Sequence, residues 1–196
     1  MAGIPTRGMR GSDLRMTTVA RAAAIAAQLQ EECSILIEHY RKKENFPPDV
    51  SDGPLVSVPP PSSQLDTRDK LWRLHSALEQ CHSLLERAIA KEEEELGGEE
   101  KGEYENRRKT VKERLLFLLN HTRELLRAAD GSSIFTPSLD GSELDDPATL
   151  FQLKWWVYRI FMEVKYWSQT AIAVLQELQS DTAKTPSKLS KRSARR

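Results

Sequence analysis

The sequence predicts an all-α protein: a long-chain four-helix bundle with up-up-down-down topology and two long crossover loops. Two observations lead to this fold class. Four stretches repeat apolar side chains at spacings of three and four, which is the period of an amphipathic helix. The segments between them are unequal: two are long and one is short and glycine-rich. We expect the helices over residues 13–43, 65–95, 103–129 and 147–179.

The first two expected helices are recognised by their apolar faces. In the first, the inward positions are Leu14, Thr18, Ala22, Ile25, Leu29, Cys33, Leu36 and Tyr40. Residues 45–64 hold six prolines and lack a helical period, so the first helix ends before them. In the second helix, the inward positions are Leu71, Leu74, Leu78, Cys81, Leu85 and Ala88. The glycines of LGGEEKGE, residues 96–103, end this helix.

The third and fourth helices follow the same spacing. In the third, the inward positions are Val111, Leu115, Leu118, Thr122 and Leu125. The fourth follows the polar segment 130–146, and Asp146 with Pro147 is a favourable pair of N-cap and first-turn residues. The core stripe of the fourth helix is Leu153, Val157, Ile160, Val164, Trp167, Ala171, Val174 and Leu178.

The lengths of the loops suggest the topology. A helix of about 30 residues is about 45 Å long. The short loop around residues 96–102 can only connect two antiparallel neighbours as a hairpin. At about 3.3 Å per residue, each of the two long loops can travel the full length of a helix. Two end-to-end crossovers account for them, as in the cytokine bundles, whereas an up-down bundle with flexible loops is the alternative.

The charges divide the chain into regions. The six basic residues in 184–196, unaccompanied by any acid, leave 23 basic and 29 acidic residues in the rest of the chain, a net charge of −6. An acidic body of this kind is a poor ligand for nucleic acid, whose phosphates select clustered Lys and Arg. We expect a flexible N-terminus over residues 1–12, one four-helix domain over 13–180, and a disordered basic tail over 181–196.

The cysteines and the distribution of apolar residues argue against a disulfide-rich protein and against a membrane protein. Cys33 and Cys81 both fall on inward helix faces, which favours small buried core residues over a disulfide or a reactive thiol. The sequence contains no run of about 18 apolar residues, so we expect no membrane insertion. The N-terminal segment lacks the apolar stretch of a signal peptide.

The fourth helix carries a second apolar face. At about 100° per residue, Phe151, Trp155, Tyr158 and Met162 point almost directly away from its core stripe. One interpretation is that a long loop covers this face with Ile134, Phe135, Leu55 and Val56. The other is that the face stays open for a partner, because exposed apolar surface beside a long cation is typical of an interaction site. Phe151 and Lys154 are the best candidates for exposure.

These residues resemble the interleukin-6-type cytokines, in the branch of ciliary neurotrophic factor, cardiotrophin and leukaemia inhibitory factor. That branch shares a Phe-x-x-Lys motif at the start of the fourth helix, and here it reads FQLK, Phe151 to Lys154. The longer stretch LFQLKWWVYRIFMEVKYW, with Trp156 and Trp167, and the end of the first helix, IEHYRKKENF, are most similar to ciliary neurotrophic factor.

The resemblance implies a monomeric secreted ligand without catalytic residues, cofactor or metal. It would bind the leukaemia inhibitory factor receptor through Phe151, Lys154 and Trp155. Exposed faces of the first and third helices would bind the shared signal-transducing glycoprotein, and the pair of receptors would activate JAK-STAT signalling. Release would occur from the cytoplasm without a classical signal peptide.

A third, non-signalling alpha receptor would bind the first long loop and the end of the fourth helix. Basic residues expected there are replaced by Thr170, Ala173 and Gln176, so the resemblance leaves open which alpha receptor is used, and whether one is used.

Two other classes of protein, an enzyme and a lipid-binding protein, are the alternatives to the cytokine. A di-iron bundle needs Glu-x-x-His on two helices, and only Glu79 and His82 have that spacing. The sequence also lacks a glycine-rich phosphate loop, Gly-x-Ser-x-Gly and His-Glu-x-x-His, so we expect no enzyme. The alternative non-enzyme is an amphipathic protein that binds lipid or a membrane surface through the two-sided fourth helix and the basic tail.

Overall fold

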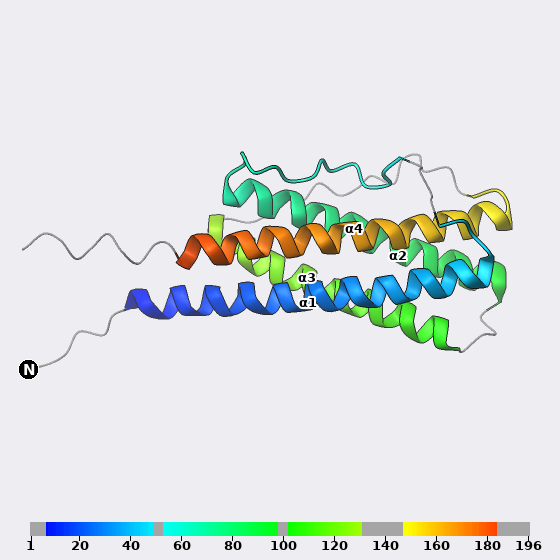
Figure 1. Cartoon of the computed structure of the whole chain (residues 1–196), viewed down its shortest axis with the longest axis horizontal. Helices are drawn as coiled ribbons and strands as arrows, with labels where there is room; N and C mark the ends of the chain where they lie inside the picture. Colours follow the sequence, from blue (N-terminus) through cyan, green and yellow to red (C-terminus); the bar gives the residue numbers. More distant parts are fainter. Residues whose placement is uncertain (1–6, 49–52, 98–101, 131–146, 184–196) are drawn as a thin grey trace, which may run out of the picture.

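The computed structural model describes residues 7–48, 53–97, 102–130 and 147–183. These residues form four α-helices and contain no strand: α1 (Arg7–Glu44), α2 (Thr67–Leu96), α3 (Glu103–Asp130) and α4 (Leu150–Ala183). The helices lie lengthwise beside one another (Figure 1). α1 and α2 each pack against both α3 and α4, so α1 lies diagonally across the bundle from α2, and α3 from α4. The prediction of an all-helical four-helix bundle is confirmed at this level.

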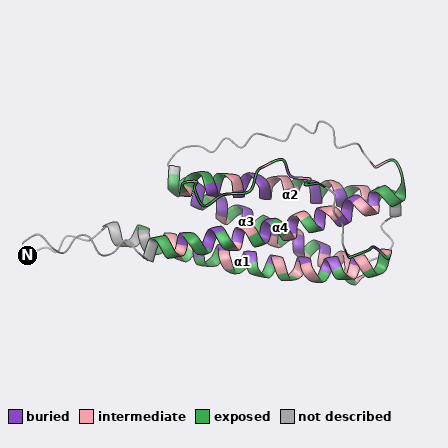
Figure 2. Cartoon of the chain, turned by 45° about the horizontal axis from the view of Figure 1, so that its top comes forward, coloured by how far each residue is buried: buried purple, intermediate pink, exposed green. Residues whose placement is uncertain are grey.

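The core runs along the centre of the bundle, and Figure 2 shows the buried residues on the helix faces that meet there. The whole predicted stripe of α4 is buried, from Leu153 to Leu178. The predicted stripes of α2 and α3 are buried too. Each helix therefore contributes one apolar face to a common core, as the spacing of three and four requires.

The start of α1 differs from the prediction. The helix begins at Arg7, six residues before the expected start at Asp13, and runs through Gly8 and Gly11. Adding turns to an existing helix is inexpensive, so it continues past the glycines. Leu14, expected in the core, is 70% exposed, and among the α1 residues whose burial is described the first buried one is Val19. The reason is that the first turns of α1 extend beyond the other helices (Figure 1).

The start of α4 also corrects an expectation. The helix begins at Leu150 and not at Pro147, and the N-cap is Thr149. Its hydroxyl oxygen accepts the Gln152 N–H at 3.2 Å, and its carbonyl accepts the Leu153 N–H at 2.9 Å. Thr-x-x-Gln is the sequence signature of a capping box. The expected cap Asp146 lies outside the described residues.

The two cysteines occupy the positions expected for core residues. Cys33 on α1 and Cys81 on α2 are both free and fully buried. Burial raises the pKa of the Cys33 thiol to about 12 and also raises the pKa of Cys81. Both side chains therefore stay protonated at neutral pH and behave as small apolar residues.

Candidate functional site

The site is built at the end of the bundle where α1 ends and α4 begins. Asn45, directly after α1, has a left-handed backbone with φ of 56°. The next N–H, that of Phe46, donates to the carbonyl of Arg41 at 3.0 Å. This is the hydrogen bond of a Schellman turn, and two prolines follow it in the sequence. The turn folds Phe46 back onto the helices, where its side chain is buried.

Phe46 is the centre of an aromatic cluster. Its ring centroid lies 6.1 Å from that of Phe151, 5.2 Å from Trp155 and 5.4 Å from Tyr158. We call these four residues the aromatic cluster. Their tilted and edge-on arrangements are the favourable geometries for aromatic pairs. The second apolar face of α4 is therefore partly covered, and the cover comes from the turn that ends α1.

The outer row of α4 divides between the two interpretations. Tyr158 is fully buried and Trp155 is partly buried, whereas Phe151 is 66% exposed and Met162 is also exposed. The exposed Phe151 ring lies at the rim of the aromatic cluster, stacked at 6.4 Å on Trp155. The Phe151 side chain is thus exposed to solvent on one side and packs against Trp155 and Phe46 on the other.

The segment after the turn covers the next part of α4. The N–H of Leu55 donates to the Glu163 carboxylate at 2.8 Å, and Arg159 donates to the Gly53 carbonyl at 2.7 Å. Val56 is buried and belongs to the core cluster, and Leu55 packs against that cluster. Ile134 and Phe135, the other expected covering residues, lie outside the described residues.

Lys154 is held by the protein itself. Its ammonium donates to the Glu44 carboxylate at 2.6 Å, and the two side chains are 27% and 11% exposed. Of the three predicted site residues, Phe151 is open, Trp155 is packed on Phe46, and Lys154 is paired. Sequence reasoning missed Glu44 and Phe46, although Asn-Phe-Pro-Pro after a helix was a signal for the turn.

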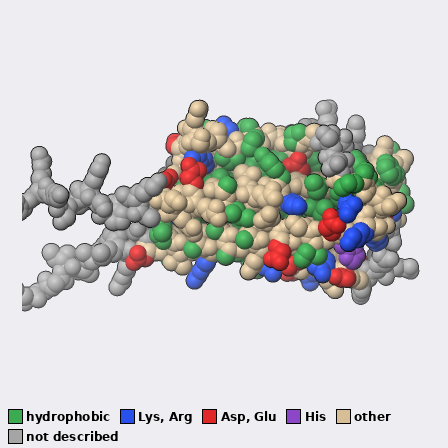
Figure 3. All heavy atoms as spheres, in the orientation of Figure 1, with side chains coloured by type: hydrophobic (Ala, Val, Ile, Leu, Met, Phe, Trp, Pro, Cys, Tyr) green, Lys and Arg blue, Asp and Glu red, His purple; other side chains and the backbone are tan. Residues whose placement is uncertain are grey.

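The charge around the site is mainly positive on the α1 side. The last turn of α1 contains Arg41, Lys42 and Lys43, which suits the negative end of its dipole. Arg41 donates to Glu38 at 3.0 Å, and this hydrogen bond lowers the pKa of Glu38. Figure 3 shows hydrophobic and basic side chains together at this end of the molecule. A partner for this surface would combine an apolar pocket with a rim of opposite charge.

A buried polar cluster lies behind the aromatic cluster. The Glu92 carboxylate accepts hydrogen bonds from the Tyr104 hydroxyl at 2.9 and 3.0 Å and from Arg108. The Tyr40 hydroxyl lies at 3.5 Å, and the Tyr40 ring is 6.3 Å from that of Phe46. Burial raises the pKa of Glu92, while Arg108 opposes that shift. A buried polar network whose hydrogen bonds are satisfied makes the packing around it rigid. We therefore expect the Phe46 ring, and the Phe151 ring that packs on it, to be held in a fixed position.

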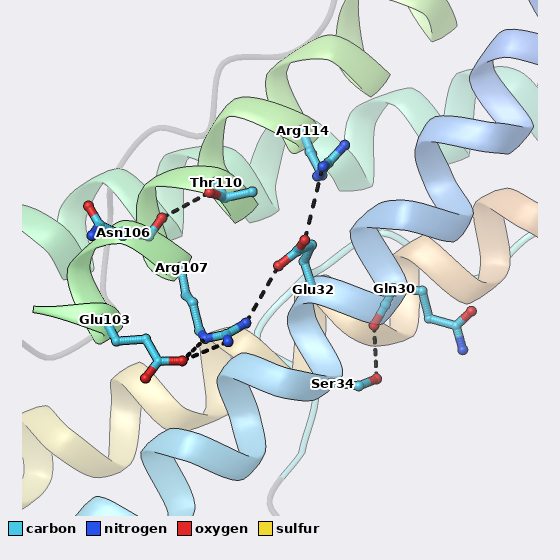
Figure 4. A network of polar contacts seen from close by, with 8 residues as sticks. All are labelled: Gln30, Glu32, Ser34, Glu103, Asn106, Arg107, Thr110 and Arg114. Carbon is cyan, nitrogen blue, oxygen red and sulfur yellow. Dashed lines mark hydrogen bonds and ion pairs between the residues drawn. The ribbon is translucent and has the colours of Figure 1, made fainter.

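The surface along the contact between α1 and α3 carries charged side chains (Figure 4). Arg107 donates to Glu103 at 2.7 Å and lies 4.0 Å from Glu32, which also lies 4.0 Å from Arg114. Thr110 is on the same helix and donates to the Asn106 carbonyl at 2.9 Å. These side chains line the seam along its solvent side.

Other chemistry finds no support in the described part of the chain. Within it, no three His, Cys, Asp or Glu side chains are grouped so that they could hold a metal ion. His82, the one histidine with an appropriately spaced glutamate, lies 3.7 Å from the Glu86 carboxylate on its own helix. Among the four helices as described, none has an apolar stretch that could cross a bilayer.

The sequence matches no protein-family model, and no curated protein is significantly similar to it. A functional assignment therefore depends on the residues and contacts described above.

Proposed function

We propose that this protein is a secreted cytokine of the interleukin-6 type. It joins the leukaemia inhibitory factor receptor to the shared signal-transducing glycoprotein and thereby activates JAK-STAT signalling. The observation that carries the proposal is the exposure of Phe151, which begins the Phe-x-x-Lys motif on the fourth helix of an all-α bundle. Most large apolar residues of α4 are buried, so an exposed phenylalanine at its start is best explained by a partner.

The topology that we propose is up-up-down-down, with residues 45–66 and 131–149 as the two crossovers. Each helix pairs with two neighbours, and the pairs α1–α2 and α3–α4 are diagonal. In Figure 1 the sequence colours advance in one direction along α1 and α2 and in the other along α3 and α4. Every neighbouring pair is then antiparallel, which is the arrangement of the long-chain cytokines.

Phe151 acts as the anchor of the first receptor contact. Its ring would enter an apolar pocket of the leukaemia inhibitory factor receptor, while Trp155 and Phe46 support it from below at 6.4 and 6.1 Å. A rigid aromatic group loses little conformational entropy on binding and often dominates an interface. The basic last turn of α1 would face acidic groups at the edge of the pocket.

The second receptor contact uses α1 and α3. Phe117 on α3 is 57% exposed, and its neighbour Leu116 is exposed as well. α3 packs directly against α1, so their outer faces form one continuous surface. This surface is on different helices from Phe151, which would allow two receptors to bind one ligand.

A third contact, to an alpha receptor, would involve the end of α4. Ala173 and Gln176 are exposed on the last turns of α4, where they offer no charge.

The packing favours the cytokine over the lipid-binding alternative. An amphipathic lipid-surface protein keeps an apolar helix face available for the bilayer. In this bundle the main apolar faces of all four helices are buried against one another. We therefore expect full helicity in buffer without vesicles, measured by circular dichroism, whereas the alternative requires helicity that increases with lipid.

The experiment that tests the proposal compares two phenylalanines of similar exposure. Phe151→Ala is expected to weaken binding to the soluble leukaemia inhibitory factor receptor ectodomain by about 2–4 kcal/mol. Phe117→Ala is the matched control, because it also removes an exposed ring but on α3. It is expected to preserve that binding and to weaken binding of the shared glycoprotein.

Both variants are expected to keep the helical circular dichroism of the parent, since neither side chain belongs to the core. If Phe151→Ala binds the leukaemia inhibitory factor receptor as tightly as the parent does, the assignment of this surface is wrong. If the parent protein binds neither ectodomain, the cytokine function is wrong.

A further inference from the structure

The pairing of Lys154 changes the role that the Phe-x-x-Lys motif suggests for it. An exposed lysine beside an aromatic anchor would be free to meet a receptor carboxylate. Here the ammonium already lies 2.6 Å from the Glu44 carboxylate, and the Glu44 side chain is 11% exposed. Glu44 is the last residue of α1, and Lys154 lies in the first turns of α4. The contact therefore joins the ends of two helices that are 110 residues apart in the sequence.

We infer that Glu44 is a positioning residue for the receptor-binding surface, acting through Lys154 to hold the first turn of α4 in place. This inference rests on the proposed function. Lys154 is three residues after Phe151, so the two side chains are neighbours on one helix face. A contact that fixes Lys154 fixes the turn from which the Phe151 ring projects.

The position of the pair at the helix ends supports this role. Helix ends fray, and the start of α4 is held by one cap at Thr149 and by contacts to α1. Glu44 is also two residues before Phe46, which lies beneath Phe151 and Trp155. The ion pair and the buried ring thus tie the same turn of α1 to the same turn of α4.

The dipoles of α1 and α4 also favour the pairing of Glu44 with Lys154. The end of α1 carries partial negative charge and the beginning of α4 carries partial positive charge. Lys154 places its ammonium next to the end of α1, and Glu44 places its carboxylate next to the beginning of α4. In the reversed pair each charge would suit the dipole of its own helix. Each swapped charge would also lie beside the like-charged end of the other helix, so the two dipole terms oppose each other and the swap chiefly preserves the attraction within the pair.

The test is a charge-swap series on the full chain. Glu44→Gln and Lys154→Gln are each expected to weaken binding to the leukaemia inhibitory factor receptor ectodomain about tenfold. The swap Glu44→Lys with Lys154→Glu is expected to restore affinity to within about threefold of the parent. A lysine that contacts the receptor directly would not be replaced by a glutamate, so an unrestored swap overturns the inference.

A second measurement does not need a receptor. Amide hydrogen exchange at residues 150–155 is expected to accelerate about tenfold in Glu44→Gln and to return to the parent rate in the swap. Unchanged exchange in Glu44→Gln overturns the inference. If the parent protein binds neither ectodomain, the proposed function fails, and the exchange rates still decide whether Glu44 holds the turn.

The chain provides a matched control at the opposite end of α4. Lys70 on α2 donates to Glu177 at 2.7 Å, which is also a contact between two helices. Glu177→Gln and the swap Lys70→Glu with Glu177→Lys are expected to leave receptor binding and exchange at residues 150–155 unchanged. A loss of binding in these variants as large as that in Glu44→Gln would mean that any interhelical ion pair has this effect, and would overturn the specific role of Glu44.

Discussion

α3 packs against its two neighbours in different ways. Toward α1 it places Arg107 and Arg114 beside Glu32, and these side chains keep contact with solvent. Toward α2 there are exposed pairs at the outer edge, but this seam also encloses Arg108 with Glu92 and His75 with Thr122. Both seams contain Arg–Glu pairs, but the pair between α3 and α1 is in contact with solvent and the pair between α3 and α2 is buried. The comparison teaches that burial decides whether a polar contact can be removed without consequence.

The largest expected effect comes from breaking the buried pair. Arg108→Met leaves the Glu92 carboxylate buried without its cation, which typically costs about 3–5 kcal/mol of unfolding free energy. Urea denaturation measures this cost. Adding Glu92→Gln removes the uncompensated charge, and the double variant is expected to recover part of the loss. If Arg108→Met is as stable as the parent, burial does not make the polar contacts between α2 and α3 more costly to remove than those between α1 and α3.

A smaller, pH-dependent effect is expected at His75. Burial lowers the pKa of His75 below its ordinary value of about 6.5, so the unfolded chain binds the proton more readily than the folded protein. The stabilisation from neutral His75 is therefore present above about pH 6.5 and is lost as the pH falls through the lowered pKa. The slope approaches about 1.4 kcal/mol per pH unit.

His82 also has a lowered pKa and Glu92 a raised one, so these groups contribute to the pH dependence of stability as well. The contribution of His75 is therefore measured as the difference between the parent and His75→Gln. Urea denaturation of parent and variant from pH 7.5 to 5.5 is expected to show a difference that shrinks with falling pH. A constant difference would show that His75 does not titrate in this range.

The smallest effect is expected at the exposed seam. Arg107→Ala removes the contacts to Glu103 and Glu32, and we expect a loss of only about 0.2–1 kcal/mol. The loss should shrink further in high salt, because exposed charges are screened. Thermal or urea denaturation at low and high salt checks both statements. A loss as large as that of Arg108→Met would remove the distinction between the seams.

The helices and their core were predictable because burial repeats along the sequence. A stripe such as Leu153 to Leu178 has to face the core, whatever the neighbouring helices are. Thr18 and Ile25 of the predicted α1 stripe are only partly buried, and the largest departure is Leu14, which has the right spacing but lies where α1 has no neighbour to cover it. Spacing indicates which side of a helix is apolar, and only the relative lengths and offsets of the helices decide where that side is covered.

The candidate site was only partly predictable, since it depends on contacts between distant residues. The outer row of α4 was identified, and Phe151 was expected to be exposed. That Tyr158 is buried follows from the turn at Asn45, which brings Phe46 against it. The pairing of Lys154 with Glu44 follows from two helix ends lying side by side. Neither contact leaves a periodic signal in the sequence.

The enclosed thiols have a consequence for the covalent chemistry of the chain. Cys33 and Cys81 are its only cysteines, both are shut inside the bundle, and burial raises the pKa of both. A protonated thiol that solvent does not reach is a poor nucleophile toward oxidants and disulfides. We therefore expect both thiols of the folded chain to stay reduced in reducing and in oxidising surroundings alike. A single cysteine introduced on the outside would be the one thiol open to a maleimide reagent.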